Sequence, residues 1–433
     1  MAERVSLRFM IIIYDLIFII FAIIYLPYLF LRKKLHKDFI QRLGFIPDGL
    51  QAERPLWIHA VSVGEARVAE ALVKQLRLVY PGTKFVFSVV TTTGNKIIRG
   101  FKSESDFLFY LPLDLSFITK KVIRRIKPSA CIIIETEIWP NLITQLNKAA
   151  IPIILVNARL SDSSFFGYRI AQPLIKPVLN RISLFCAQSQ RDAERLSALG
   201  VRQDKITTTG NMKYDIIDNI NTARDSLNYR LSLGIKERGK LFVAGSTHPQ
   251  EEEIILSAYQ ELSKEFPGLK LLIAPRHPER AASIENLVSK SGFQPVLVSR
   301  LSLSLAPQPE SAVFILDTIG QLIHFYAACD IVFVGGSLVK KGGQNILEPA
   351  LFKKPVIFGP HMFNFRDISN LFLAKQAARL VHNQEELLKE ARFLLNNPAE
   401  LEGMGSRARQ LLLENQGATK RNVEKISLLI SHG

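Results

Sequence analysis

The stretch that decides the fold class is LWIHAVSVGEARVAEALVKQL, residues Leu56–Leu76, because it joins an apolar run, a tight turn and an amphipathic helix. LWIHAVS is typical of a short buried strand, and Val68, Leu72 and Leu76 then follow at helical spacing. Glu65 comes directly after a glycine, at the start of the helix. Since the positive end of the helix dipole stabilises a carboxylate in the first turn, a purely structural role for Glu65 stays open at this stage.

Length and composition set the class of protein. A chain of 433 residues exceeds what one ordinary core supports, so we expect two domains. The formal net charge of +16 suits anionic partners such as nucleic acid, acidic lipid or phosphorylated substrates. No basic run is interleaved with aromatic residues as in a nucleic-acid module, so we predict no nucleic-acid partner. Cys131, Cys186 and Cys329 lie in apolar contexts without a CxxC pair, which predicts buried thiols and a reducing compartment.

The N-terminal segment MIIIYDLIFIIFAIIYLPYLFL, residues 10–31, is apolar and carries one charge, Asp15. About 20 such residues are enough to cross a bilayer. A signal peptide is less consistent with this segment because no small-residue cleavage site follows it. The basic run RKKLHKDFIQR follows instead, which predicts a membrane anchor over residues 1–31, with the rest of the chain on the cytoplasmic side. A helix lying in the interface remains the alternative, since Asp15 and Pro27 weaken a span.

Apolar runs alternate with helical stretches in two series along the rest of the chain. Examples are KFVFSVV and ACIIIET in the first series, and KLFVAGST and DIVFVGGS in the second. Their continuous hydrophobicity predicts parallel strands that are covered on both faces. We therefore predict an α/β protein with two Rossmann-like, doubly wound domains that face each other across a cleft. The expected domains are residues 32–215 and 239–433, joined by a linker at 216–238.

Ligands of doubly wound sheets bind at the carboxyl ends of the strands, so the residues after each apolar run are candidates for the site. In the first series these include Glu65, Glu135, Arg159 and Lys213. Glu137 could equally be the inward-facing acid of ETE, because strand residues alternate faces. A solvated strand-end acid and a surface lysine are the structural alternatives.

The second series places other polar groups at the same positions. Arg276 and His277 stand between two prolines in an exposed turn, where a guanidinium would suit a phosphate or nucleobase. In GGSLVKKGGQNILEP the glycine-rich loop predicts backbone N–H groups that hold a phosphate, and Glu348 could accept hydrogen bonds from ribose. The loop is neither GxGxxG nor GxxxxGK[ST], which argues against classical dinucleotide and P-loop sites. The acids at 251–253 are interpreted as first-turn helix acids.

A metal site is not expected. His248 and His277 lack the spacing of a zinc motif, and no DxD triplet is present. A nucleotide site without a metal suggests that cations and helix dipoles stabilise the leaving group.

Five separated motifs together resemble one family. HAVSVGE, ETEIWPN, GNMK, APRHPER and GGQNILEP are similar, in order and spacing, to motifs of the bacterial 3-deoxy-D-manno-octulosonic acid (Kdo) transferases of lipopolysaccharide synthesis. The likeness runs from the N-terminal segment to about Phe365. It implies a GT-B fold, CMP-Kdo as donor, a tetraacylated phosphorylated lipid A precursor as acceptor, and no metal or other cofactor.

The resemblance also implies roles for particular residues. Glu65 matches the general base that takes the proton of the attacking hydroxyl, while Glu135 and Lys213 match residues that stabilise the transition state. The segments that match the CMP-binding residues are Pro275, Arg276, His277, Ile319, Gly320, Gln321, Asn345, Ile346, Leu347 and Glu348. Gln321 stands where relatives often carry an acid, so a role there that needs a charge does not carry over.

Two other functions fit parts of the pattern. Another GT-B transferase could use a different sugar nucleotide, such as a UDP-sugar, on a lipid-linked acceptor. A non-catalytic, membrane-tethered nucleotide-binding protein would also have two such domains. The number of Kdo residues transferred, their linkage and the oligomeric state do not follow from the sequence.

Overall fold

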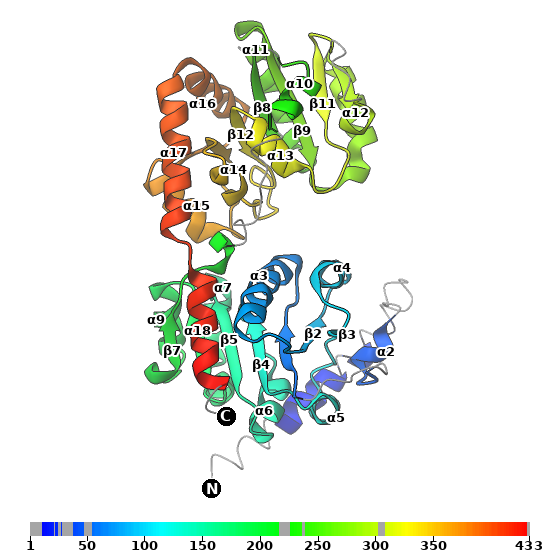
Figure 1. Cartoon of the computed structure of the whole chain (residues 1–433), viewed down its shortest axis with the longest axis vertical. Coiled ribbons are helices and arrows are strands. Elements are labelled where there is room, and N and C mark those ends of the chain that lie inside the picture. The colour runs from blue at the N-terminus through cyan, green and yellow to red at the C-terminus, as the bar shows by residue number, and fades with distance from the viewer. Residues whose placement is uncertain are drawn as a thin grey trace. The chain divides into compact units, whose positions relative to one another are not determined.

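The computed structural model describes residues 11–20, 22–24, 27, 38–46, 54–215, 226–235, 239–301 and 308–430. The chain forms two compact units: unit 1 comprises residues 1–216 and 415–433, and unit 2 comprises residues 217–414. Of the linker expected at 216–238, only residues 226–235 are described, and they include the short helix α10 (Ser226–Ser232). Figure 1 shows the two units with their elements labelled.

Unit 1 alternates strands and helices along the chain. Its strands are β1 (Leu56–His59), β2 (Phe85–Val89), β3 (Phe107–Tyr110), β4 (Ala130–Ile134), β5 (Ile153–Ala158), β6 (Leu184–Ala187) and β7 (Ile206–Thr208). Its helices are α2 (Phe39–Arg42), α3 (Val63–Val79), α4 (Thr92–Phe101), α5 (Ser116–Ile126), α6 (Pro140–Lys148), α7 (Asp162–Ile170), α8 (Gln172–Leu179), α9 (Gln190–Ala198) and α18 (Ala418–Ile430).

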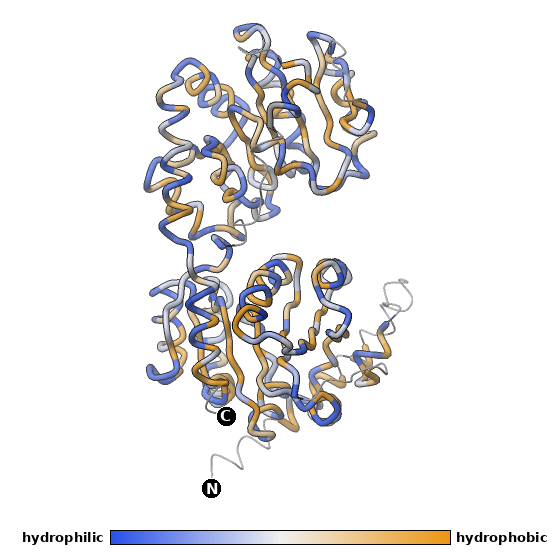
Figure 2. The backbone as a smooth tube through the Cα atoms, viewed as in Figure 1, coloured by the Kyte–Doolittle hydropathy of each residue, from blue (hydrophilic) through white to orange (hydrophobic). Residues whose placement is uncertain are grey.

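The seven strands of unit 1 form one parallel sheet in the order β3-β2-β1-β4-β5-β6-β7. The strand order reverses between β1 and β4, which makes this the topological switch point where ligands of such sheets bind. Both faces of the sheet are buried: Cys131 and Ile133 of β4 pack in one hydrophobic cluster, whereas Ile132 and Ile134 pack in another. Figure 2 shows hydrophobic residues along the strands. The apolar runs are continuous because both faces of each strand are covered, as predicted.

The C-terminal helix α18 belongs to unit 1, whereas the sequence analysis expected the second domain to continue to residue 433. Ala418, Val423 and Ile426 of α18 are buried in the same cluster as Leu72 and Leu76 of α3. The preceding helix α17 (Pro398–Glu414) packs in unit 2 instead. The physical reason is that the apolar stripe of α18 completes the cover of the first sheet.

Unit 2 repeats the architecture with a second seven-stranded parallel sheet in the order β10-β11-β9-β8-β12-β13-β14. Its strands are β8 (Lys240–Thr247), β9 (Leu269–Pro275), β10 (Gln294–Leu297), β11 (Ala312–Ile315), β12 (Ile331–Val334), β13 (Val356–Phe358) and β14 (Ala378–Leu380). Its remaining helices are α11 (Glu251–Glu265), α12 (Ala281–Lys290), α13 (Leu322–Ala328), α14 (Leu347–Leu351), α15 (Arg366–Ala374) and α16 (Gln384–Asn396). The prediction of two doubly wound parallel sheets is confirmed. Here the switch point lies between β8 and β12.

Residues 11–20 and 22–24 are helical and are called the N-terminal helix below. Other parts of the anchor expected over residues 1–31 lie outside the described residues. Within the ranges that the structure describes, no helix combines the length and the apolar character needed to cross a membrane. The three cysteines are buried and unpaired, as predicted, and burial raises the pKa of the Cys186 and Cys329 thiols to about 12.

Candidate functional site

Glu65 lies at the start of α3, beside the switch point of the first sheet. Ser62 caps the helix by accepting a hydrogen bond from the Glu65 backbone N–H. The Glu65 carboxylate in turn accepts hydrogen bonds from the Ser62 hydroxyl (2.7 Å) and from the Val61 N–H (2.7 Å). This reciprocal pattern resembles a capping box, so the structural role considered for Glu65 is real. These hydrogen bonds do not test whether Glu65 also acts as a general base.

The environment of Glu65 nevertheless suits proton transfer. Its side chain is almost completely buried, with 6% of the residue exposed. Burial raises the pKa of Glu65, and the negative charge of Glu135 raises it further, against the opposing effect of its hydrogen bonds. A carboxylate with a raised pKa is a stronger base than an ordinary one, and general bases work best when their pKa is near the operating pH.

Glu135 and Lys213 form an ion pair at the end of β4. The distance between Lys213 Nζ and Glu135 Oε1 is 3.1 Å, and the side chains are 15% and 23% exposed, respectively. Glu135 has a left-handed backbone with φ of 59°, and its N–H donates to the Val156 carbonyl at 2.9 Å. The structure therefore brings together Glu65, Glu135 and Lys213, three of the candidates that the sequence analysis singled out in the first domain.

Asn157 positions the turn that carries Lys213. It is fully buried at the end of β5 and also has a left-handed backbone, with φ of 54°. Its side-chain oxygen accepts a hydrogen bond from the Met212 N–H at 2.9 Å, and its carbonyl accepts one from Gln188 Nε2 at 2.9 Å. A residue far from Lys213 in the sequence thus fixes the lysine's backbone.

Glu137 joins the same group of carboxylates. Burial, followed by the charges of Glu65 and Glu135, raises the pKa of Glu137 to about 7. The sequence left open which acid of ETE faces inward. Both acids act electrostatically on neighbouring groups: beyond the effect of burial, Glu135 raises the pKa of Glu65, and Glu137 raises that of Tyr168. Thr136 between them is held by Arg159, because its hydroxyl accepts from the Arg159 N–H and donates to the Arg159 carbonyl. We refer to Glu65, Glu135 and Glu137 as the carboxylate cluster.

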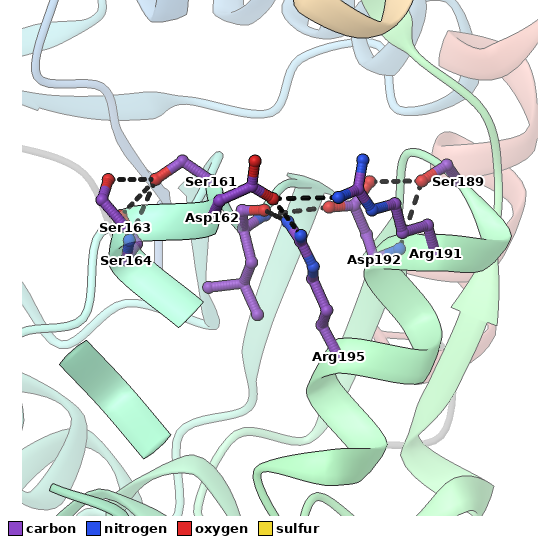
Figure 3. A network of polar contacts seen from close by, with 9 residues as sticks. Ser161, Asp162, Ser163, Ser164, Ser189, Arg191, Asp192 and Arg195 are labelled. Atoms are coloured by element: carbon purple, nitrogen blue, oxygen red, sulfur yellow. Dashed lines mark hydrogen bonds and ion pairs between the residues drawn. The ribbon is translucent and has the colours of Figure 1, made fainter. Parts of the chain in front are cut away.

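The loop that contains Arg159 is held in place by a polar network, shown in Figure 3. Asp162 at the start of α7 forms ion pairs with Arg191 and Arg195 of α9. Asp192 accepts a hydrogen bond from the Leu160 N–H at 2.9 Å. The sequence analysis did not find this network, because its members are about 30 residues apart and belong to two helix starts. It fixes the segment between β5 and α7 beside the carboxylate cluster.

Part of the glycine-rich loop of unit 2 differs from the prediction. The sequence predicted that its backbone N–H groups hold a phosphate. Those of Gly336, Ser337 and Leu338 instead donate to the carboxylate of Glu251, at 2.7 to 3.0 Å. Glu251 is fully buried and also accepts from the His248 N–H at 2.9 Å. An internal anion therefore occupies these donors, so they are not available to a phosphate in this conformation.

This arrangement depends on a close approach between the last residues of β8 and the loop that follows β12. A Cβ atom at Gly335 would lie 2.5 Å from the Ser246 carbonyl oxygen, so only glycine fits there. The acids at 251–253 are first-turn helix acids, as interpreted from the sequence. Glu252, the second of them, accepts from Thr247 Oγ1 and Arg280, both at 2.8 Å. None of these contacts indicates a metal, and among the described residues no three His, Cys, Asp or Glu side chains could hold one.

The residues expected to bind CMP fall into two groups. Arg276, His277 and Ile319 are exposed at the ends of strands, as a ligand contact requires. Ile346 and Leu347 are fully buried, so only their backbone could take part.

The remaining expected CMP contacts lie at turns. Pro275 is the buried last residue of β9, and Gly320 has a φ of 88°. Gln321 accepts a hydrogen bond from the Thr318 hydroxyl at 2.7 Å. Asn345 Nδ2 donates to Glu348 Oε1 at 3.1 Å.

His248 is a further candidate in unit 2 that the sequence analysis considered only as a metal ligand. Its ring stands edge-on to that of His277, with 6.1 Å between the ring centroids. Its Nε2 atom is buried and has no hydrogen-bond partner among the described residues. Burial, helped by the positive charges of the nearby His277 and Lys341, lowers the pKa of His248, which favours the neutral form of the ring. The sequence could have pointed to His248 as a candidate, because it directly follows the strand β8.

Comparisons with known proteins agree with the motifs. Residues 37–216 match the family model described as 3-deoxy-D-manno-octulosonic-acid transferase (kdotransferase). The 3-deoxy-D-manno-octulosonic acid transferase of Haemophilus influenzae is 40% identical over 385 residues, covering 88% of each chain. The enzyme of the same name from Chlamydophila psittaci is 30% identical and covers 96% of each chain.

Solved structures of lower identity show the fold alone. A UDP-N-acetylglucosamine 2-epimerase has a TM-score of 0.60 at 14% identity, covering 88% of this chain and 98% of its own. A glycosyltransferase from Rickettsia africae has a TM-score of 0.58 at 13% identity, with the same two coverages. They are consistent with a GT-B-like pair of Rossmann-like domains. Because the likeness to the curated relatives is high and spans most of both chains, the protein belongs to the 3-deoxy-D-manno-octulosonic acid (Kdo) transferase family.

Proposed function

We propose that this protein transfers Kdo from CMP-Kdo to a lipid A precursor and releases CMP. The observation that carries the proposal is the meeting of Glu65, Glu135 and Lys213 at the switch point of the first sheet, in a chain that belongs to the family. Taken alone, Glu65 could be only a helix-capping acid, and Glu135 could be only a solvated acid at a strand end. Their electrostatic coupling inside a buried cluster is what an acid–base site requires.

In the proposed mechanism the reaction is a single inverting displacement. The acceptor hydroxyl attacks the anomeric carbon of Kdo, its proton passes to Glu65, and the bond from that carbon to the CMP phosphate breaks. Lys213 and Glu135 stabilise the charges that develop in the transition state. The positive charge on the sugar is oxocarbenium-like, which a nearby carboxylate favours. A good leaving group such as CMP makes a metal dispensable.

The donor is proposed to bind at the strand ends of unit 2, through Arg276, His277 and the turn at Gly320. Asn345 and Glu348 contribute at the start of α14. The amides of 336–338 in the glycine-rich loop are not part of the proposed site, because Glu251 accepts their hydrogen bonds.

We also propose that the enzyme works at the cytoplasmic face of the inner membrane. The apolar N-terminal segment and the net charge of +16 support attachment to an anionic surface, where a phosphorylated lipid acceptor is found. The experiment described next also tests the alternative that the enzyme uses a different sugar-nucleotide donor.

The experiment is to incubate the purified protein with CMP-Kdo and lipid A precursor in the presence of EDTA, and to weigh the lipid products. One or more mass increments of Kdo would establish the donor, the acceptor and independence from metal, and would count the transfers. No increment with CMP still bound would send the search to other acceptors. No binding of CMP, together with binding of UDP, would refute the donor.

A further inference from the structure

The N-terminal helix carries one charged residue, Asp15, whose carboxylate is hydrogen-bonded to unit 1. Asp15 Oδ1 accepts hydrogen bonds from the Ser116 N–H (3.1 Å) and from Asn141 Nδ2 (2.7 Å), and Oδ2 accepts from the Ser116 hydroxyl (2.5 Å). Ser116 begins α5 and Asn141 lies in the first turn of α6. The carboxylate thus lies at the positive ends of two helices of unit 1, which favour a negative charge.

A second bond joins the helix to the same place. The side chains of Tyr14 and Asp114 share a hydrogen bond. Asp114 is buried, with 1% exposed, and its carboxylate also accepts from the Asn141 N–H (3.0 Å) and the Leu142 N–H (2.8 Å). We call Tyr14, Asp15 and their partners the polar clip. It fixes the N-terminal helix against unit 1 at two successive residues.

The other side of the helix is exposed and apolar. The large apolar residues left accessible, between 40% and 71% of each, are Ile12, Ile13, Leu16, Ile17, Ile20, Ile23 and Ile24. They recur every three to four residues, as in a helix with one apolar face. Single exposed apolar side chains are ordinary, but a contiguous row of this kind marks a surface that binds an apolar partner.

The adjacent helix α5 supplies positive charge. Its exposed residues include Lys120, Lys121, Arg124 and Arg125, and Ser116–Ile126 contains no acid. Phe117 on the same helix is 62% exposed. An apolar row beside a cationic helix is complementary to the boundary between anionic headgroups and acyl chains of a bilayer.

The polar clip conflicts with a helix that crosses the membrane. Leu31 ends the apolar segment 16 residues after Asp15, which corresponds to about 24 Å of helix. If the segment crossed a hydrocarbon core about 30 Å thick, with unit 1 on its C-terminal side, Asp15 would lie near the opposite leaflet. It could not then contact α5 and α6.

We propose that the N-terminal helix lies in the plane of an anionic bilayer surface, held by the polar clip, and that its apolar row and the cations of α5 form one docking surface. The proposal rests on the membrane association proposed above and specifies its geometry. A lipid surface is the partner, because it offers apolar acyl chains to the apolar row and anionic headgroups to the cations of α5 at the same boundary. The buried native cysteines allow cysteine labelling at chosen positions of the full-length protein.

The test places single cysteines at Ile13, Ile17, Ile20 and Ile24, labels them with bimane, and binds the protein to vesicles of phosphatidylethanolamine and phosphatidylglycerol. Nitroxides at acyl carbon 5 or 12 report depth by quenching. An in-plane helix predicts preferential quenching from carbon 5 at all four positions. A depth that changes steadily along the helix would overturn the proposal. Replacing phosphatidylglycerol with a zwitterionic lipid should weaken binding at least tenfold, because several cations contribute.

Two variants separate the clip from the apolar row. Asp15→Leu removes the three hydrogen bonds that Asp15 contributes to the clip and should abolish the uniform depth, whereas Ile17→Ser keeps the clip and should weaken vesicle binding about tenfold without changing the depth ratio. An unchanged depth profile in Asp15→Leu would refute the clip. If the protein does not bind vesicles, the docking surface is wrong, while Kdo transfer to an acceptor in detergent still decides the proposed enzymatic function independently.

Discussion

The role of Glu65 can be separated from its role in capping α3 by comparing two substitutions, Glu65→Gln and Ser62→Ala. Glu65→Gln keeps the size of the side chain but removes the basic oxygen. Ser62→Ala removes the cap and the 2.7 Å hydrogen bond to Glu65 while it leaves the carboxylate in place. If Glu65 is the base, only the first change should abolish transfer, although both changes disturb the same helix start.

The expected magnitudes differ enough to be decisive. Loss of a general base lowers the rate by about 10²- to 10⁴-fold, which corresponds to roughly 3–5 kcal/mol in the barrier. Loss of the Ser62 cap costs about 1 kcal/mol of folding stability, against roughly 5–15 kcal/mol in total, so the protein stays folded. The Ser62 hydrogen bond lowers the pKa of Glu65. Ser62→Ala should therefore raise that pKa and reduce the rate less than tenfold at neutral pH.

The assay is the initial rate of CMP release with CMP-Kdo and the lipid acceptor, together with thermal unfolding and CMP binding for each variant. Glu65→Gln should bind CMP normally and unfold within a few degrees of the parent protein. If Ser62→Ala lost as much activity as Glu65→Gln, the geometry of the helix start rather than proton transfer would explain both losses. Parental activity in Glu65→Gln would refute the mechanism outright.

Three more changes test the rest of the site. Lys213→Met should lower kcat about 100-fold or more, and an effect on KM alone would contradict this. Because the ion pair with Glu135 is largely buried, with side chains 15% and 23% exposed, the unpaired carboxylate should also lower Tm, so kcat is compared at a temperature where both proteins are folded. Glu251→Ala leaves four N–H groups without their acceptor, two of them buried and two part-buried, and should cost about 4 kcal/mol in a denaturant titration, whereas the exposed neighbour Glu253→Ala should cost almost nothing. Burial, followed by the charges of neighbouring carboxylates, raises the pKa of Glu65 and raises that of Glu137 to about 7, so kcat/KM should rise with pH as these coupled acids lose their protons. Glu137→Gln removes one of the coupled acids and should move this rise, and an unmoved profile would exclude the coupling.

The parts of the fold that depend on local pattern could be predicted from the sequence. The sequence of β4 is continuously apolar because its residues pack alternately into two hydrophobic clusters, one on each side of the sheet. The rule that parallel strands present their carboxyl ends at one edge then brought Glu65 and Glu135 together, and both lie at the switch point. Lys213 follows the short strand β7, and its approach to Glu135 required the tertiary contact through Asn157.

What the sequence could not supply were the contacts between distant segments. Glu251 is 85 residues from Gly336, and nothing in a glycine-rich loop shows that its amides already have an internal acceptor. The apolar stripe of α18 would fit either sheet, and only packing decides that it covers the first. The polar clip of the N-terminal helix is similar, since Asp15 looked only like a weak point in a membrane span.

The backbone at Glu135 links the fold to the proposed chemistry. A left-handed conformation costs a residue with a side chain about 1 kcal/mol or more, and glycine would adopt it without strain. The turn after β4 therefore needs the conformation but not the carboxylate. The same conformation at Lys127 merely ends α5, with its side chain exposed, whereas at Glu135 it directs the carboxylate to Lys213 and into electrostatic reach of Glu65. Because the strained residue stands next to the buried acid proposed as the base, the strain is better explained by what the side chain does than by the needs of the turn.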